Sequence, residues 1–160
     1  MLSANLSKDL EDLGALIAEE IGTDIVEWHV AVGELTMTVE RTSITRILTY
    51  LRDSESLQFS QLMDVCGVDY LGRTPRFEVV YHLLSLVHNK RIRIKLAVDD
   101  GMPVPTVSSI YSSANWWERE VFDLYGIPFD DHPDLRRILT DYGFEGYPLR
   151  KDFPLTGYVE

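Results

Sequence analysis

Apolar residues recur at steps of three and four near the N-terminus, a spacing that predicts an amphipathic helix over residues 7–21. Gly22 follows the last apolar residue of this pattern and is expected to end the helix. Apolar and polar residues then alternate over residues 24–32 and again over residues 35–39, on either side of a glycine-containing turn. A period of two around such a turn predicts a β-hairpin.

The pattern changes again in the following segment. A second amphipathic helix is predicted to carry Ile44 and to end near Asp53, with Thr42 or Ser43 as its N-cap. Residues 59–68 are ambiguous because their apolar positions fit a short helix and a buried strand about equally well. We expect a mixture of both there.

The clearest strands are predicted over residues 76–83 and 91–96, where apolar residues alternate with charged ones. One face of this pair is apolar and the other polar, which is typical of an antiparallel sheet. Residues 99–101 are expected to end the second strand, and residues 107–111 to form a short helix. The order of elements predicts an α+β fold, with a mostly antiparallel sheet and helices packed on one face.

A further helix is predicted between Asn115 and Gly126. Asn115 is suited to capping its first turn, and Glu118 stands three residues later, where it could reach back to the cap. Gly126 is expected to supply the left-handed residue that closes the other end. The helical pattern stops after this glycine.

Residues 127–160, which we call the tail, contain four prolines and no sustained helical or strand period. One short helix is expected to begin at Pro133, with Asp131 or His132 as its cap and Asp134 in its first turn. The rest of the tail is predicted to be extended chain.

The tail carries many aromatic and aliphatic residues, so it has too much apolar surface for a disordered segment. It either folds back on its own domain or lies on another protein, where Arg, Tyr and Phe are favoured anchors. We favour the second interpretation. The chain is then a globular domain over residues 1–126 followed by an extended, partner-binding tail over residues 127–160.

Composition narrows the possible functions. The chain has 160 residues and 45% apolar residues, which fits one domain with a real core. A formal charge of -11 argues against nucleic acid and against direct docking on anionic lipid. Cys66 is the only cysteine, so the chain alone cannot supply the four thiolates of an iron–sulfur cluster. No apolar stretch is long enough for a membrane span, and no signal peptide is apparent, so we expect a cytosolic chain that reaches a membrane only through partners.

The run from Asp130 to Asp134 places three carboxylates and an imidazole within five residues, which raises the possibility of a metal-dependent hydrolase. No second ligand cluster is visible in the sequence, and the run is also explained as a helix start. His29, His82 and His88 lie in strand or turn patterns without a nucleophile nearby in the sequence. We therefore expect no catalytic and no metal-binding residue in the chain.

Charged residues mark the root of the tail and two positions along it. Arg119 and Asp123 are four residues apart on one helical face and are predicted to pair. Together with Glu118 they would fix the direction in which the tail leaves the domain. Arg136-Arg137 and Arg150-Lys151 are basic islands in an acidic chain, and we expect them to pair with carboxylates of a partner.

Two stretches resemble a known family. The first spans the helix and the start of the tail, and its motif is Glu118-Arg119-Glu120, two residues, Asp123-Leu124-Tyr125, six residues, His132, three residues, Arg136, one residue and Ile138-Leu139. The second is the run from Gly146 to Pro154. Both are similar to the 30-kDa subunit of respiratory complex I, the NADH-quinone oxidoreductase of bacteria. The resemblance covers nearly the whole chain.

The resemblance implies a cofactor-free structural subunit of the peripheral arm, packed on the 49-kDa subunit near the quinone site. FMN and the iron–sulfur clusters would lie in partner subunits of a complex that passes electrons from NADH to quinone and translocates protons. The complex would sit on the cytoplasmic side of the bacterial inner membrane or on the mitochondrial matrix side. A related membrane-bound hydrogenase or a photosynthetic NDH complex is the alternative within the same family.

The interface with the partner is expected to use charged and aromatic residues from the last helix and the tail: Glu118, Arg119, Asp123, His132, Arg136, Arg137, Tyr147, Arg150, Lys151, Asp152 and Phe153. Members of the family usually continue beyond the residues that end this sequence, with a further extended and charged segment. We therefore expect either a truncated chain or a short variant.

Overall fold

The computed structural model describes residues 2–157, with side chains from Ser7 onward. Short 3₁₀ turns are labelled η. In chain order the elements are α1 (Leu2–Ile21), η1 (Gly22–Asp24), β1 (Ile25–Ala31), β2 (Glu34–Val39), η2 (Arg41–Ser43), α2 (Ile44–Asp53), β3 (Gln61–Asp69), β4 (Phe77–Ser85), β5 (Lys90–Val98), β6 (Val104–Pro105), α3 (Ala114–Tyr125) and β7 (Phe129–Asp130).

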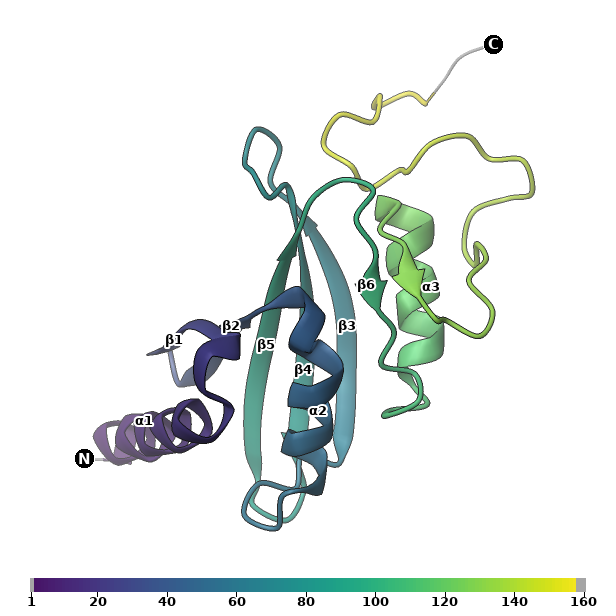
Figure 1. Cartoon of the computed structure of the whole chain (residues 1–160). Coiled ribbons are helices and arrows are strands. Elements are labelled where there is room, and N and C mark those ends of the chain that lie inside the picture. The colour runs from purple at the N-terminus through teal and green to yellow at the C-terminus, as the bar shows by residue number, and fades with distance from the viewer. Residues whose placement is uncertain (1, 158–160) are drawn as a thin grey trace.

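Five strands form one sheet in the order β1-β2-β5-β4-β3 (Figure 1). Strands β2 and β5 run parallel, and the other three neighbouring pairs are antiparallel. The short strands β6 and β7 pair in parallel beside this sheet. The prediction of an α+β fold with a mostly antiparallel sheet is confirmed.

Alternation along the central strands builds the core. In β5, Ile92 and Ile94 are buried, whereas Arg91 and Arg93 point to the other face and remain accessible. The apolar residues of α1, α2 and α3 join the same buried cluster as the apolar face of the sheet. The three helices therefore cover one face, and the opposite face carries mainly polar side chains.

The ambiguous segment is a strand over most of its length. Residues 61–69 pair with β4 from end to end, so the mixture of helix and strand that the sequence predicted is replaced by the single strand β3. The second helix occurs as predicted. Ser43 precedes it but makes no capping hydrogen bond with its side chain, because η2 leads directly into α2.

Two predicted helices are absent from the described part of the chain. The segment that begins at Val107 is a turn, in which the N–H groups of Ile110 and Tyr111 both donate to the carbonyl of Val107. The hydroxyl of Tyr111 donates to the buried carbonyl of Phe59 at 2.6 Å and holds the turn on the core. No helix follows Pro133 either, because the amides beyond it are engaged by a side chain of α3, described below.

The two ends of α3 differ in how well they were predicted. Gly126 closes the helix with a φ of 73°, and its N–H donates to the carbonyl of Phe122, as expected of a left-handed C-cap. Asn115 is not the N-cap, because the helix already begins at Ala114. Glu118 does not complete a capping box, since its carboxyl group is turned into the protein interior.

Helix α3 approaches the sheet closely at Gly67. A Cβ atom on this residue would lie 2.7 Å from Cδ2 of the Tyr125 ring. The absence of a side chain in β3 thus sets how deeply the last turn of α3 sits on the sheet. This contact positions the root of the tail.

We expect Gly67→Ala to destabilise the chain by about 1–3 kcal/mol, because the added methyl group overpacks against Tyr125. Denaturant unfolding of the purified chain measures the effect. In a Tyr125→Ala background the same substitution should cost clearly less, since the colliding ring is gone. If Gly67→Ala lowers the unfolding free energy equally in both backgrounds, the contact between residue 67 and the Tyr125 ring is not the cause of the destabilisation.

Candidate functional site

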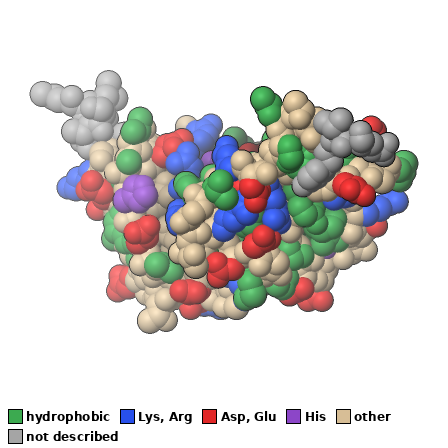
Figure 2. All heavy atoms as spheres, turned by 90° about the horizontal axis from the view of Figure 1, so that it is seen from above, with side chains coloured by type: hydrophobic (Ala, Val, Ile, Leu, Met, Phe, Trp, Pro, Cys, Tyr) green, Lys and Arg blue, Asp and Glu red, His purple; other side chains and the backbone are tan. Residues whose placement is uncertain are grey.

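The tail runs from the end of α3 along that helix and then across one end of the sheet (Figure 1). Seen from above, Lys and Arg side chains gather near the middle of this end, between carboxylates and apolar side chains (Figure 2). Most of the predicted interface residues lie in this region. They contact one another across long stretches of the sequence, which we describe from the helix outward.

Asp123 of α3 is the central anchor of the tail. Its side chain is fully buried. Oδ2 accepts hydrogen bonds from the N–H groups of Ile138, Leu139 and Thr140 at 3.0, 2.7 and 2.9 Å, and Oδ1 accepts from the Thr140 hydroxyl at 2.6 Å. Burial alone would raise the pKa of Asp123, but these hydrogen bonds outweigh it and lower the pKa to about 2. The group is therefore a carboxylate that gathers tail backbone around itself.

Arg119 and Arg137 complete this anchor from the two sides. Nε of Arg119 donates to the carbonyl of Arg136 at 3.0 Å and Nη2 to that of Arg137 at 3.3 Å. The Arg137 guanidinium reaches Asp123 at 3.3 Å and donates to the carbonyl of Gly146 at 3.0 Å. The predicted Arg119–Asp123 pair is therefore wrong, because each side chain is engaged by the backbone of the tail.

Arg150 forms a second anchor. Its guanidinium makes a two-pronged contact with Asp100 at 2.9 and 2.8 Å, and its Nε donates to the carbonyl of Tyr125 at 2.6 Å. The same group lies over the rings of Phe77 and Tyr147, 5.1 and 4.7 Å from their centroids. Planar guanidinium groups favour such paired and stacked contacts.

Asp69 and Arg76 form a third anchor at the end of the sheet. Arg76 binds both oxygens of Asp69 at 2.8 Å and both oxygens of Asp152 at 3.0 and 2.8 Å. The N–H of Lys151 donates to Asp69 at 2.7 Å. Hydrogen bonds from Arg76 lower the pKa of Asp69 and of Asp152. Two carboxylates, one guanidinium and a backbone amide thus fix the tail again.

The other predicted residues have mixed positions. The His132 ring is buried, and its Nε2 donates to the carbonyl of Asn115 at 2.9 Å. The Arg136 side chain is 71% exposed, and its one ion pair among the described residues is with Asp134 on the tail itself. The ring of Phe153 stacks on Phe144 with centroids 6.0 Å apart.

The predicted basic islands therefore pair mostly within the chain. Arg137 and Arg150 bind Asp123 and Asp100, whereas the sequence predicts pairing with carboxylates of a partner. No local pattern indicates this pairing, because the partners lie 14 and 50 residues away. Asp69, Arg76 and Asp100 were missed for the same reason, and only their places at strand ends could have drawn attention to them.

Several apolar side chains of the tail point away from the domain. Tyr142 and Leu155 are fully exposed, Leu139 is 61% exposed and Leu149 is also exposed. Trp116 on the first turn of α3 is 68% exposed. The backbone of the tail is thus held by its own domain, while apolar side chains along it face outward.

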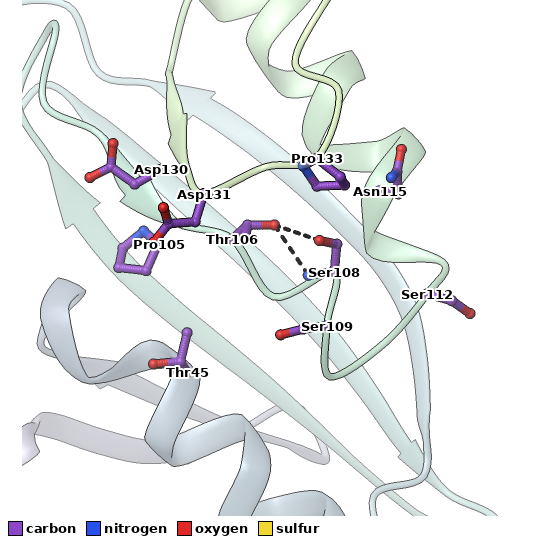
Figure 3. A pocket seen from close by; sticks show the side chains of 10 residues that line it. All are labelled: Thr45, Pro105, Thr106, Ser108, Ser109, Ser112, Asn115, Asp130, Asp131 and Pro133. Carbon is purple, nitrogen blue, oxygen red and sulfur yellow. Dashed lines mark hydrogen bonds between the residues drawn. The ribbon is translucent and has the colours of Figure 1, made fainter.

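A pocket of about 650 Å³ lies beside the root of the tail (Figure 3). It is lined by hydroxyl, amide, carboxylate and proline side chains: Thr45, Pro105, Thr106, Ser108, Ser109, Ser112, Asn115, Asp130, Asp131 and Pro133. The ring of His132 is not part of this lining, and its Nε2 donates to the carbonyl of Asn115. The Asp/His run therefore does not converge on the pocket as a metal site would require.

Asp64, Cys66 and His82 are the residues in the described part of the chain whose potential metal-ligand atoms converge, within 4.8 Å of one another. Arg93 donates to Nε2 of His82 at 3.1 Å and so places a permanent cation beside the group. Burial raises the pKa of the Cys66 thiol, whereas a metal ligand must lose that proton. We therefore do not assign a metal here.

None of the helices described in the structure combines the length and the apolar character needed to cross a membrane.

The family described as the 30-kDa subunit of respiratory-chain NADH dehydrogenase matches residues 37–159. An NADH-quinone oxidoreductase subunit of Paramagnetospirillum magneticum is 58% identical over 97% of this chain and 78% of its own length. The corresponding protein of Maricaulis maris is 59% identical, with the same two coverages.

A protein of the membrane-bound sulfane sulfur reductase, described as an archaeal respiratory membrane complex, has a similar structure. Its TM-score is 0.76 and its sequence identity 28%, covering 91% of this chain and 85% of that one. The family match spans most of the sequence, including both motifs noted above. The chain therefore belongs to the 30-kDa subunit family of respiratory-chain NADH dehydrogenases, whose bacterial members include these NADH-quinone oxidoreductase subunits.

Proposed function

We propose that the chain is a non-catalytic, cofactor-free structural subunit of NADH-quinone oxidoreductase that packs through its tail on the 49-kDa subunit, near the quinone site. The observation that carries this proposal is the difference between the backbone and the side chains of the tail. The backbone is tied to the domain by Asp123, Arg150 and the Asp69–Arg76 pair, while Leu139 and Tyr142 face outward.

A surface of this kind suits docking because its shape exists before the partner arrives. Ordering a loop on binding costs about 0.5–1.5 kcal/mol for each side chain that is immobilised, and prior anchoring reduces that cost. The exposed residues Tyr142 and Arg136 are of types enriched at protein interfaces, and exposed Leu139 adds apolar surface near them in the sequence.

The same family resemblance supports the rest of the proposal. Iron–sulfur clusters belong in partner subunits, because the chain has a single cysteine, and the resemblance implies the same place for FMN. The protein would lie on the cytoplasmic side of the inner membrane, or on the matrix side in mitochondria, and associate with the membrane only through the complex. The archaeal neighbour leaves open an equivalent role in a related respiratory complex, but the 58% identical relative favours the NADH-linked enzyme.

Exchanging Arg136 for Glu tests the docking surface. We expect Arg136→Glu to reduce co-purification with the 49-kDa subunit, with an apparent loss of affinity of about 5- to 30-fold, because this residue is exposed and its ion pair in the described part of the chain stays within the tail. The unfolding free energy of the chain should change by no more than about 0.5 kcal/mol. Arg137→Glu should instead lower the unfolding free energy of the chain, because it removes the contacts of Arg137 with Asp123 and with the carbonyl of Gly146.

Lys8→Glu is the matched control, since it reverses an exposed charge on α1, at the opposite end of the molecule from the tail (Figure 1). It should leave co-purification unchanged. If Arg136→Glu binds the 49-kDa subunit as well as the wild-type chain does, and Tyr142→Ser does too, the tail is not the docking surface.

Asp123→Asn should release the tail from α3 and destabilise the chain by about 2 kcal/mol at pH 7. The folded pKa of about 2 lies below the ordinary value of 3.8, so the stabilisation is present above about pH 4 and is lost as the pH falls toward 2. Urea unfolding between pH 2 and 7 measures this. In Asp123→Asn, the unfolding free energy should no longer show the decrease that Asp123 causes between about pH 4 and pH 2.

The exposed tail residue Asp141 provides the control, because its carboxylate lies outside the anchor around Asp123. Asp141→Asn should unfold like the wild-type chain. Limited proteolysis then separates stability from anchoring: with Asp123→Asn, residues near Thr140 should be cut faster than α3. Cleavage rates equal to the wild type would contradict the role of Asp123.

A further inference from the structure

Glu118 is a second buried acid on α3, and its surroundings differ from those of Asp123. Its side chain has no exposed surface. Oε1 accepts a hydrogen bond from the N–H of Val107 at 2.7 Å, and Oε2 lies 2.5 Å from the hydroxyl oxygen of Thr106. The docking role proposed above does not use this carboxyl group. Within the described residues, no Lys or Arg nitrogen lies within 4 Å of it.

The imidazole ring of His132 beside Glu118 does not act as a cation. Nε2 of His132 lies 3.7 Å from Oε2 of Glu118, but it donates to the carbonyl of Asn115 at 2.9 Å. Nδ1 of the same ring accepts the N–H of Asp134 at 3.0 Å, so it has no proton of its own. These two hydrogen bonds assign a neutral imidazole that is protonated at Nε2. Glu118 therefore has no positive counter-charge.

The other ionisable groups around Glu118 are neutral or acidic. From β4, the buried hydroxyl of Tyr81 faces it, and the nearby carboxyl raises the pKa of Tyr81 further above the level that burial sets. Asp130 and Asp131 line the adjacent pocket, and Asp134 lies on the same segment as His132. On α3 itself, Arg119 is directed to the tail carbonyls. Ionised Glu118 would thus be a buried charge among neutral and negative groups.

A short chain of hydroxyl groups links this acid to solvent. The Thr106 hydroxyl lies 2.5 Å from Oε2 of Glu118, to which it donates when the acid is ionised, and 2.9 Å from the Ser108 hydroxyl, to which it donates when Glu118 carries the proton. Both Thr106 and Ser108 line the pocket described above, and the dashed lines in Figure 3 mark the hydrogen bonds between them. A hydroxyl group can accept one hydrogen bond while it donates another. The two side chains can therefore pass a proton along while their oxygen atoms stay in place.

We propose that Glu118 is a proton-binding site that exchanges its proton with the pocket through the hydroxyl groups of Thr106 and Ser108. On release, the carboxyl proton passes to Thr106 while the Thr106 proton passes to Ser108 and the Ser108 proton to water in the pocket. Uptake is the reverse. Each hydroxyl group ends with one proton, and the carboxyl group changes by one charge.

Burial raises the pKa of Glu118 to about 7, although the hydrogen bonds from Thr106 and Val107 act in the opposite direction. The site therefore changes its proton occupancy near neutral pH. Because the folded pKa lies above the ordinary value of 4.5, folding takes up a proton between these two values. The stability that Glu118 contributes is complete below about pH 4.5 and falls as the pH rises through 7.

Infrared titration of the purified full chain tests the proposal through the C=O stretch of protonated carboxyl groups. We expect one carboxyl group to lose this band with a midpoint near pH 7, well above the ordinary value of 4.5. Glu118→Gln should remove that step, and Glu120→Gln, an exposed neighbour on α3, should retain it. No step above about pH 5.5, or a step that survives Glu118→Gln, would overturn the assignment.

Thr106 variants test the hydroxyl link and remain informative if Glu118→Gln does not fold. Thr106→Val removes a hydrogen bond that lowers the pKa, so its midpoint should move upward from that of the wild-type chain. Thr106→Ser retains the hydroxyl group, so its titration midpoint should lie within about 0.3 pH units of the wild-type midpoint. This difference is small compared with the variation of carboxyl pKa values among proteins. A Thr106→Val midpoint equal to that of the wild type would refute the link between Thr106 and Glu118.

Discussion

A carboxylate cannot remain ionised in the protein interior unless hydrogen bonds replace its water, and Asp123 meets this requirement with the backbone of the tail. Three successive N–H groups and one hydroxyl group converge on it. The tail path therefore follows from the position of one side chain on α3. That position depends in turn on Gly67, which lets the last turn of the helix settle on the sheet.

The two buried acids of α3 show how surroundings decide the charge of chemically similar groups. Asp123 receives several donors together with Arg137, and its pKa falls to about 2. Glu118 receives two donors and no cation, and burial raises its pKa to about 7. The first acid is a fixed negative charge that organises the tail. The second is poised to change its charge at neutral pH, five residues earlier on the same helix.

Local patterns predicted much of this fold, and long-range chemistry explains what they missed. The alternation in β4 and β5 and the left-handed glycine after α3 were read correctly, because each is decided by neighbouring residues. The helix at Pro133 was wrong, because amides that would have formed its hydrogen bonds donate to Asp123. The capping box at Asn115 failed for a similar reason, since Glu118 bonds to Val107, eleven residues away.

The distinction between local patterns and long-range contacts also applies to the proposed docking role of the tail. Prolines and aromatic residues indicated an extended segment with a dedicated role, but not which of its charges serve the chain and which are available to a partner. Arg137 and Arg150 hold the tail in place, whereas Arg136 points outward with Leu139 and Tyr142. Because fixing a backbone residue costs about 1–2 kcal/mol, a tail that is already fixed by its own domain leaves more of the contact energy for association. A tail that ion pairs fix on its own domain is thus suited to present exposed apolar side chains in a set arrangement to the proposed partner.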